Sequence, residues 1–266
     1  MTAFHAIILG GIQGLTEFLP ISSSGHLILV PYIAGWPDQG IAFDIAAHLG
    51  SLFAVTIYFR KDLRKIFSYS ATFTLFYDSG IKKPNLLGAI LLGTLPVVIV
   101  GFFLYDTVVE NIRSNYLVAS TTIIFGLVLW WSDNSGKKNR SLQTLSASEV
   151  LLIGLAQAIA LIPGTSRSGI TITACLFLGL RREEAARFSF LLSIPVIALA
   201  TFYEMVVLLV GPSEPNWKLL LCTTVSAGVA AFFCISFFMR VIKRIGVWPF
   251  CLYRLCLGAL ILLLSV

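Results

Sequence analysis

Residues 13–26 read Gln-Gly-Leu-Thr-Glu-Phe-Leu-Pro-Ile-Ser-Ser-Ser-Gly-His, which places a carboxylate, three consecutive serines and an imidazole in an apolar part of the chain. An ionisable side chain inside a membrane costs about 2.5–3.5 kcal/mol on insertion scales, so such residues usually serve a function. Pro20 also interrupts the helix that the preceding apolar residues would form. The stretch therefore predicts a functional site built around a broken helix.

A second stretch repeats this pattern. Residues 157–169 read Gln-Ala-Ile-Ala-Leu-Ile-Pro-Gly-Thr-Ser-Arg-Ser-Gly and align with residues 13–25 without a gap. The alignment makes these pairs: Gln13 with Gln157, Ser22 with Ser166, Ser23 with Arg167, Ser24 with Ser168, and Gly25 with Gly169. We therefore predict one duplicated membrane domain over residues 1–266, with repeat one at about 1–131, repeat two at about 149–266 and a cytoplasmic linker at about 132–148.

The composition is that of an integral membrane protein. Of the 266 residues, 57% are hydrophobic and 12% are charged, and the mean hydropathy is +0.89. Soluble proteins average about 45–50% apolar and 25% charged residues. The apolar runs are continuous and of helical length, which indicates an all-α bundle rather than a closed barrel of alternating segments.

The apolar runs predict six transmembrane helices and two re-entrant hairpins. The six spans are expected at about 42–60, 86–104, 115–131, 188–210, 217–239 and 249–265. Shorter runs flank the two breaks, at 3–19 and 26–35 and at 149–162 and 170–180. Each of these runs is too short to span alone, because a span needs about 20 apolar residues. The first run has no basic region or cleavage site, so we expect it to stay in the mature protein.

The distribution of charge predicts the orientation. The net charge of +6 comes from Lys and Arg in short loops, which topology explains better than a nucleic-acid partner does. These residues gather in four connections, at 61–83, 132–148, 181–187 and 240–248, whereas Arg113 and Lys218 fall in the opposite loops. The positive-inside rule makes the basic side cytoplasmic and turns both termini outward. The two hairpins then enter from opposite sides, which is the inverted-repeat arrangement of many secondary transporters.

The two breaks offer an anion site. Ser22–Gly25 precedes one short helix and Ser166–Gly169 precedes the other, and helix N-termini with free backbone N–H groups bind phosphate. Arg167 adds a permanently charged planar group that matches phosphate oxygens.

The first break also offers acid–base chemistry. Glu17 and His26 are residue types that transfer protons, and Ser23 or Ser22 is a candidate nucleophile between them. An anion site with a base and a hydroxyl predicts phosphoryl transfer. A transporter or flippase of a phosphorylated lipid or another anion is the alternative, because carriers share the broken-helix arrangement.

Three motifs resemble the signatures of the bacterial undecaprenyl-diphosphate phosphatases, called UppP or BacA. They are Gln13-x-x-x-Glu17, the run Ser22–His26, and Pro163-Gly-Thr-Ser-Arg-Ser-x-x-Thr171. The similarity covers the whole chain. It implies hydrolysis of undecaprenyl diphosphate to the monophosphate and phosphate at the outer face of the bacterial inner membrane. That reaction would recycle the lipid carrier for cell-wall synthesis and confer bacitracin resistance.

The resemblance also implies roles for individual residues. It implies catalytic roles for Glu17, His26, Ser23 and Arg167, with Arg167 as the diphosphate clamp. It implies substrate-binding roles for these residues: Gln13, Ser22, Ser24, Ser166, Ser168 and Thr171. It further implies a divalent cation, Mg²⁺ or Ca²⁺, with Glu17 as a ligand. The family has Glu or Gln at the first motif position, and Gln13 removes one potential metal ligand here.

Several alternatives stay open at this point. Asp44 and His48 share a helical face of the first span, where they either pack as a polar pair against another helix or lie beside the site. The nucleophile could be serine, histidine or water. The sequence also leaves open the metal, the lipid length, any movement of lipid, and the oligomeric state, with a homodimer as one alternative.

Overall fold

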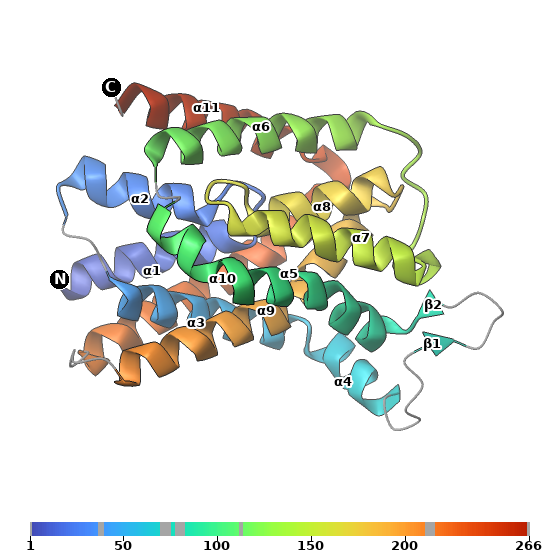
Figure 1. Cartoon of the computed structure of the whole chain (residues 1–266), viewed down its shortest axis with the longest axis horizontal. Coiled ribbons are helices and arrows are strands. Elements are labelled where there is room, and N and C mark those ends of the chain that lie inside the picture. The colour runs from blue at the N-terminus through green and yellow to red at the C-terminus, as the bar shows by residue number, and fades with distance from the viewer. Residues whose placement is uncertain are drawn as a thin grey trace.

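The computed structural model describes residues 2–36, 40–69, 76–77, 83–111, 114–210 and 216–264. Within these ranges the chain is helical, with one short antiparallel pair of strands (Figure 1). The α-helices are α1 (Ala3–Glu17), α2 (Ser23–Ala34), α3 (Ile41–Tyr58), α4 (Arg60–Tyr69), α5 (Leu86–Asn111), α6 (Asn115–Asn134), α7 (Ala147–Ala158), α8 (Arg167–Phe177), α9 (Arg182–Val210), α10 (Trp217–Ile245) and α11 (Trp248–Leu264). The remaining elements are β1 (Phe76–Tyr77), β2 (Lys83–Pro84) and the 3-10 turns η2 (Leu142–Thr144) and η3 (Ile159–Leu161).

The helical membrane fold predicted from the composition is confirmed. Helices α3, α5, α6, α9 and α10 are each long and apolar enough to cross a membrane. The run expected to form a sixth span is α11, which has 17 residues and belongs with the shorter apolar helices.

Four spans are longer than the sequence predicted. Helix α5 continues to Asn111 rather than ending near residue 104, and α6 continues to Asn134 rather than ending near 131. Helix α9 begins at Arg182 rather than near residue 188, and α10 continues to Ile245 rather than ending near 239. Acidic residues favour the first turn of a helix and basic residues favour the last. The charges that seemed to mark loops are therefore helix ends, with Glu183 and Glu184 starting α9 and Lys243 and Arg244 closing α10.

Two hairpins of short helices meet in the middle of the molecule. Helix α1 starts at the end where both termini lie and α2 returns to that end, whereas α7 starts at the opposite end and α8 returns to it (Figure 1). The chain reverses at Ser22 and Ser166, which are the non-glycine residues with positive φ in the described part of the chain, at 71° and 69°. Such conformations cost about 1–3 kcal/mol and are concentrated at functional sites.

Close helix packing holds the first hairpin in place. Helices α1 and α3 both lie against α10, and a Cβ atom on Gly14 would come within 2.2 Å of the Ala227 carbonyl oxygen. A Cβ atom on Gly50 of α3 would come equally close, 2.2 Å, to the Thr224 carbonyl oxygen. Small residues let membrane helices approach this closely. The glycines thus fix the positions of α1 and α3, which carry much of the site.

The start of the second hairpin is anchored by charge. Ser146 and Glu149 form a capping box at the N-terminus of α7, and Arg140 pairs with Glu149 at 2.6 Å. The hydrogen bond from Arg140 lowers the pKa of Glu149 to about 2. This carboxylate therefore stays ionised and keeps the linker attached to α7.

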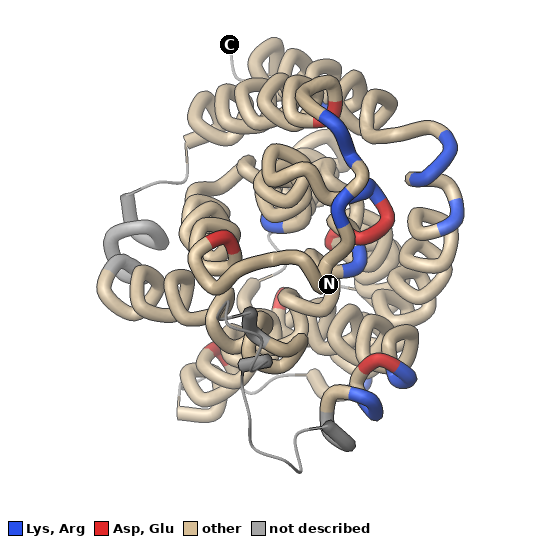
Figure 2. Tube along the Cα trace, turned by 90° about the vertical axis from the view of Figure 1, so that its right-hand side faces the viewer, with Lys and Arg blue, Asp and Glu red and all other residues tan. Residues whose placement is uncertain are grey.

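Basic residues gather at one end of the molecule, opposite the termini (Figure 2). Ion pairs at this end join α9 to its neighbours: Arg187 pairs with Asp62 of α4, and Arg182 pairs with Asp133 of α6 at 2.6 Å. Residues 70–75, 78–82 and 112–113, which include Arg113 and much of the predicted 61–83 connection, lie outside the described residues.

Candidate active site

The centre of the site is the carboxylate of Glu17, at the end of α1, whose side chain is 9% exposed. Arg167 Nη2 donates to Glu17 Oε1 at 2.9 Å. On the other oxygen, Glu17 Oε2 accepts from Ser23 Oγ at 3.1 Å and from Gln13 Nε2 at 2.9 Å. One carboxylate therefore joins residues from α1, α2 and α8, as the sequence predicted for Glu17, Ser23 and Arg167.

Arg167 is the first residue of α8 and is largely enclosed where the hairpins meet. Its side chain is 12% exposed, and its guanidinium lies 5.9 Å from the centre of the Phe18 ring. Besides Glu17, it donates through Nη1 to the carbonyl oxygen of Ser189 on α9 at 3.3 Å. A guanidinium has five N–H donors, so this geometry leaves Arg167 capacity to bind an anion.

The serines of the two breaks have matching geometry. Ser22 Oγ lies 3.1 Å from Ser24 Oγ, and Ser166 Oγ lies 3.2 Å from Ser168 Oγ. Ser166 also caps α8 by accepting from the backbone N–H of Gly169 at 3.2 Å. The aligned serine pairs therefore share the hydroxyl–hydroxyl contact, whereas Ser22 makes no side-chain cap to α2.

Each break also contacts the backbone of the other. The N–H of Gly164 donates to Ser24 Oγ at 3.4 Å, and Ser168 Oγ donates to the Leu19 carbonyl oxygen at 2.9 Å. These reciprocal bonds hold the N-termini of α2 and α8 side by side. Two positive helix ends thus face one region, which favours a bound anion.

Gln13 and Gln157, which the alignment pairs, have different hydrogen-bond partners. Gln13 joins Glu17, whereas its aligned partner Gln157 donates to the Gly93 carbonyl oxygen of α5 at 3.3 Å. Thr171 is fully buried and bonds to the Arg167 carbonyl oxygen at 2.9 Å and to Ser189 Oγ at 2.7 Å. Thr171 therefore supports the turn that carries Arg167, and its contact with phosphate stays a prediction.

His26 makes its hydrogen bonds away from Glu17, with which the sequence analysis paired it. Its Nδ1 lies 2.7 Å from the Ser22 carbonyl oxygen, and its Nε2 lies 2.6 Å from the hydroxyl of Tyr253. The two rings are stacked at 3° with centres 5.5 Å apart. A carbonyl only accepts, so Nδ1 carries a proton, and in the neutral ring Nε2 accepts from the Tyr253 hydroxyl.

Two residues of α11 that contact the breaks, Tyr253 and Arg254, were not predicted from the sequence. Arg254 is fully buried and donates to four carbonyl oxygens: those of Thr122 at 3.0 Å, Gly164 at 3.0 Å, Pro20 at 3.4 Å and Thr121 at 3.5 Å. It thereby ties both breaks to α6. An arginine within the apolar run 249–265 was the available signal, since such residues are functional candidates by default.

His48 lies beside the site, which was one of the two alternatives for Asp44 and His48. Its Nε2 is 3.1 Å from Gln13 Nε2 and 3.9 Å from Glu17 Oε2. Its Nδ1 is 2.8 Å from the carbonyl oxygen of Asp44 on the same helix. Gln13 thus connects the Glu17 carboxylate to a second imidazole.

Few side chains around Glu17 could bind a divalent cation. The part of the chain that the structure describes contains no group of three His, Cys, Asp or Glu residues placed to hold a metal. Gln13 Oε1, however, is buried without a hydrogen-bond partner, on the same amide whose Nε2 contacts Glu17 Oε2 and His48 Nε2. Mg²⁺ often binds one or two carboxylates together with substrate phosphates. The residues therefore fit a cation whose coordination the substrate completes.

The fold and the site together define a class of protein: a helical membrane protein in which two hairpins of short helices bring together a carboxylate, a hydroxyl and a guanidinium. The family model described as "Bacitracin resistance protein BacA" matches residues 6–260. The chain belongs to the BacA family.

Similar proteins cover almost the whole chain. Undecaprenyl-diphosphatase 1 of Pseudoalteromonas translucida is 50% identical over 259 residues, which is 97% of each chain. Undecaprenyl-diphosphatase of Nitrosococcus oceani is 50% identical over 261 residues, which is 98% of each chain. Undecaprenyl-diphosphatase of Alteromonas mediterranea is 49% identical over 262 residues.

Proposed function

We propose that this chain is a membrane phosphatase that hydrolyses undecaprenyl diphosphate to undecaprenyl phosphate and inorganic phosphate. The observation that carries the proposal is the Glu17 carboxylate held between Ser23 and Arg167, in a chain about half identical over its full length to relatives named for this activity. In the cell the reaction returns the lipid carrier to cell-wall synthesis. It also removes the diphosphate lipid and so confers bacitracin resistance.

The headgroup binds at the facing N-termini of α2 and α8. Backbone N–H groups and the hydroxyls of Ser22, Ser24, Ser166 and Ser168 contact the phosphate oxygens. Arg167 turns part of its guanidinium from Glu17 to the diphosphate, because two N–H groups of arginine match two phosphate oxygens. The lipid tail stays among the apolar helices.

Ser23 is the nucleophile in this mechanism. Its Oγ attacks the terminal phosphorus and gives its proton to Glu17 Oε2, to which it already donates at 3.1 Å. The bond from this phosphorus to the bridging oxygen breaks, and its electron pair and the proton from Glu17 leave with undecaprenyl phosphate. Water then attacks the phosphoserine, and Glu17 passes the water's proton to Ser23 Oγ, which releases inorganic phosphate.

Two further groups assist these steps. His26, one turn after Ser23 on α2, is a second proton donor or acceptor at the headgroup. A bound divalent cation, Mg²⁺ or Ca²⁺, would be held by Glu17 and Gln13 and would neutralise phosphate charge.

We also propose how the molecule sits in the bacterial inner membrane. Helix α11 is counted as a sixth span, and α1–α2 and α7–α8 are re-entrant hairpins of an inverted repeat. Their entry from opposite ends supports this arrangement (Figure 1). The basic end is cytoplasmic by the positive-inside rule (Figure 2). The site then opens to the outer face.

Phosphate release tests the enzyme against the carrier alternative, which the two opposed interrupted helices favour. Purified wild type in detergent is expected to release one phosphate per molecule of long-chain polyprenyl diphosphate. A chelator is expected to stop the release, and added Mg²⁺ or Ca²⁺ to restore it. Tight binding of the diphosphate by folded protein without phosphate release would contradict the enzyme and favour transport.

Tyr253→Phe tests whether α11 takes part in the reaction. The variant keeps the stacked ring but removes the hydroxyl that bonds to His26, so kcat/KM is expected to fall about tenfold at an unchanged melting temperature. Tyr32→Phe is the matched control, because the Tyr32 hydroxyl donates to the Leu264 carbonyl oxygen, away from the site. Equal activity of both variants would show that the hydroxyl of Tyr253 plays no part.

A further inference from the structure

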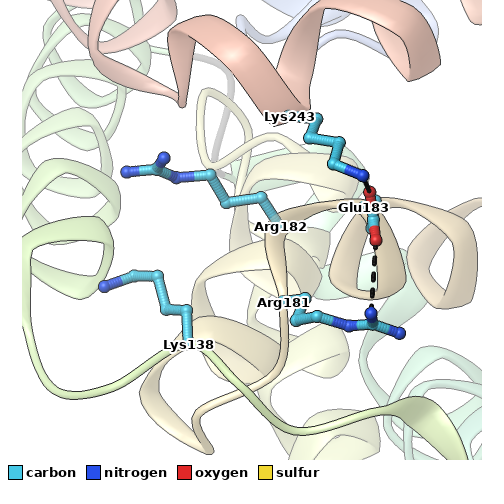
Figure 3. Close-up of a pocket in the computed structure, with 5 residues that line it drawn as sticks. All are labelled: Lys138, Arg181, Arg182, Glu183 and Lys243. Carbon is cyan, nitrogen blue, oxygen red and sulfur yellow. Dashed lines mark ion pairs between the residues drawn. The ribbon is translucent and has the colours of Figure 1, made fainter.

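A second charged cavity lies at the basic end of the molecule. It has a volume of about 250 Å³ and is lined by five charged residues from three parts of the chain: Lys138, Arg181, Arg182, Glu183 and Lys243 (Figure 3). Lys138 follows α6, and Arg181 precedes α9. Arg182 and Glu183 start α9, and Lys243 belongs to the last turn of α10. We refer to it as the basic cavity.

The lining of the basic cavity has more positive than negative charge. Glu183 is its one carboxylate, and it pairs with both Arg181, at 3.6 Å, and Lys243, at 3.4 Å (Figure 3). Lys138 Nζ donates to the carbonyl oxygen of Ser135 at 3.0 Å, which supplies no opposite charge. Lys138 and Arg182 extend in the same direction (Figure 3). Arg182 is balanced by Asp133 of α6, and Arg181 also pairs with Glu184 at 3.5 Å. Lys138 has no carboxylate partner among the ion pairs of the described residues, so an anion beside it would balance its charge.

The frame of the basic cavity is fixed by contacts among three helix ends. Arg182 makes two bonds to Asp133 of α6, from Nε at 2.6 Å and from Nη2 at 3.0 Å. Asp133 also accepts from the backbone N–H of Val247, at the corner between α10 and α11, at 3.4 Å. The site is therefore formed before a ligand arrives, which lowers the entropy cost of binding.

Aromatic side chains place the basic cavity at a membrane interface. Trp131, in the last turn of α6, is 62% exposed, and Trp248, which starts α11, is 56% exposed. Trp131 packs edge-on against Phe177, with ring centres 5.3 Å apart. Tryptophan is enriched where membrane helices meet the headgroup layer. Charged and aromatic groups thus combine as they would around a lipid headgroup and the start of its acyl chains.

We propose that the basic cavity binds the phosphate headgroup of an anionic phospholipid from the leaflet at this end of the protein. Topology alone requires basic residues here, but it does not require four of them around one cavity, with exposed tryptophans at the helix ends that carry its Asp133 and Val247 contacts. Basic pockets between membrane helices on the cytoplasmic side are known to bind anionic headgroups. Free phosphate would be attracted by the same charges but has no acyl chains to lie against the exposed Trp131 and Trp248 at this end. The proposal does not depend on the phosphatase reaction.

The test compares lipid binding to two double variants of the full chain. Lys138→Gln/Lys243→Gln removes two charges from the cavity and leaves the Arg182–Asp133 pair intact. Lys61→Gln/Arg64→Gln removes two charges from exposed positions of α4 at the same end. Binding of phosphatidylglycerol and phosphatidylcholine is measured by native mass spectrometry of protein in neutral detergent, and the effect of inorganic phosphate is measured on the melting temperature.

The cavity variant is expected to bind phosphatidylglycerol about thirtyfold more weakly than wild type, since each basic residue near a surface contributes about 1 kcal/mol. The affinity of the α4 variant for phosphatidylglycerol should stay within about twofold of wild type. Phosphatidylcholine should bind wild type and both variants equally. Hydrolysis in detergent should be unchanged in the cavity variant. Equal weakening in both double variants, or none in the cavity variant, would overturn the proposal. Stabilisation by inorganic phosphate equal to that by phosphatidylglycerol would overturn the assignment to a lipid.

Discussion

Replacing Arg167 with alanine is expected to lower kcat/KM for undecaprenyl diphosphate by at least about a thousandfold, the scale on which arginine stabilises phosphoryl transfer elsewhere. Arg167 is largely enclosed at the first turn of α8 and reaches both Glu17 and the Ser189 carbonyl oxygen. Besides Arg167, the side chains that hydrogen-bond to Glu17 are Gln13 and Ser23, which are neutral. His48 lies 3.9 Å from Glu17 Oε2 without the planar donor pair of arginine. The measurement is phosphate release at several substrate concentrations, which separates kcat from KM.

Arg167→Ala also leaves Glu17 without its charge partner, and breaking a buried pair can cost about 3–5 kcal/mol of stability. Arg167→Lys is therefore made alongside it. Lysine keeps the charge on Glu17 but lacks the planar pair of donors, so this variant should fold and yet remain at least about a hundredfold impaired. Arg64→Ala on the exposed face of α4 is the control and should match wild type. An Arg167→Ala enzyme within tenfold of wild type would remove Arg167 from the mechanism.

The sequence predicted the parts of the site that depend on local pattern. The sequence itself shows the break at Pro20, the serines after it and their alignment with residues 163–169. From these features we expected the two breaks to meet, and Glu17, Ser23 and Arg167 do lie together in the structure. The prediction worked because a helix must stop where its backbone is broken and because a buried charge needs a partner. The exact division into two repeats stays a prediction.

The sequence could not predict contacts that depend on how distant helices pack. Tyr253 reaches His26 only because α11 lies beside α6 and the first hairpin, and nothing near either residue indicates this partner. Arg254 was visible as a charge in an apolar run, but its four carbonyl partners come from three separate segments. The positive φ of Ser22 and Ser166 could not be predicted from the sequence either, because glycine is the residue that normally adopts this conformation.

Replacing Ser23 with alanine is expected to reduce phosphate release to the background of the assay, at least about a thousandfold below wild type. The geometry distinguishes Ser23 from the other serines of the first break: Ser23 Oγ donates to Glu17 Oε2, whereas Ser22 Oγ lies against Ser24 Oγ. A serine that donates to a carboxylate has a base to take its proton as it attacks. Glu17→Gln keeps the shape of the base and removes its charge, so it should cause a similar loss. The double variant should be no worse than either single one, because residues that act as a unit have strongly non-additive effects.

Trapping the intermediate separates attack by Ser23 from direct attack by water. Wild type is mixed with excess substrate and quenched in acid within the first turnover, and the peptide that contains residues 22–24 is analysed by mass spectrometry. Phosphate on Ser23, together with a burst of undecaprenyl phosphate ahead of inorganic phosphate, is the expected result. Ser24→Ala is the control and should still form the phosphoserine, since its hydroxyl accepts from the Gly164 N–H and does not contact Glu17 in the described hydrogen bonds. If Ser23→Ala keeps more than a tenth of the activity and no phosphopeptide is found, water is the nucleophile and Glu17 activates it directly. In that case Ser23 would orient Glu17, and the same carboxylate would still be the base.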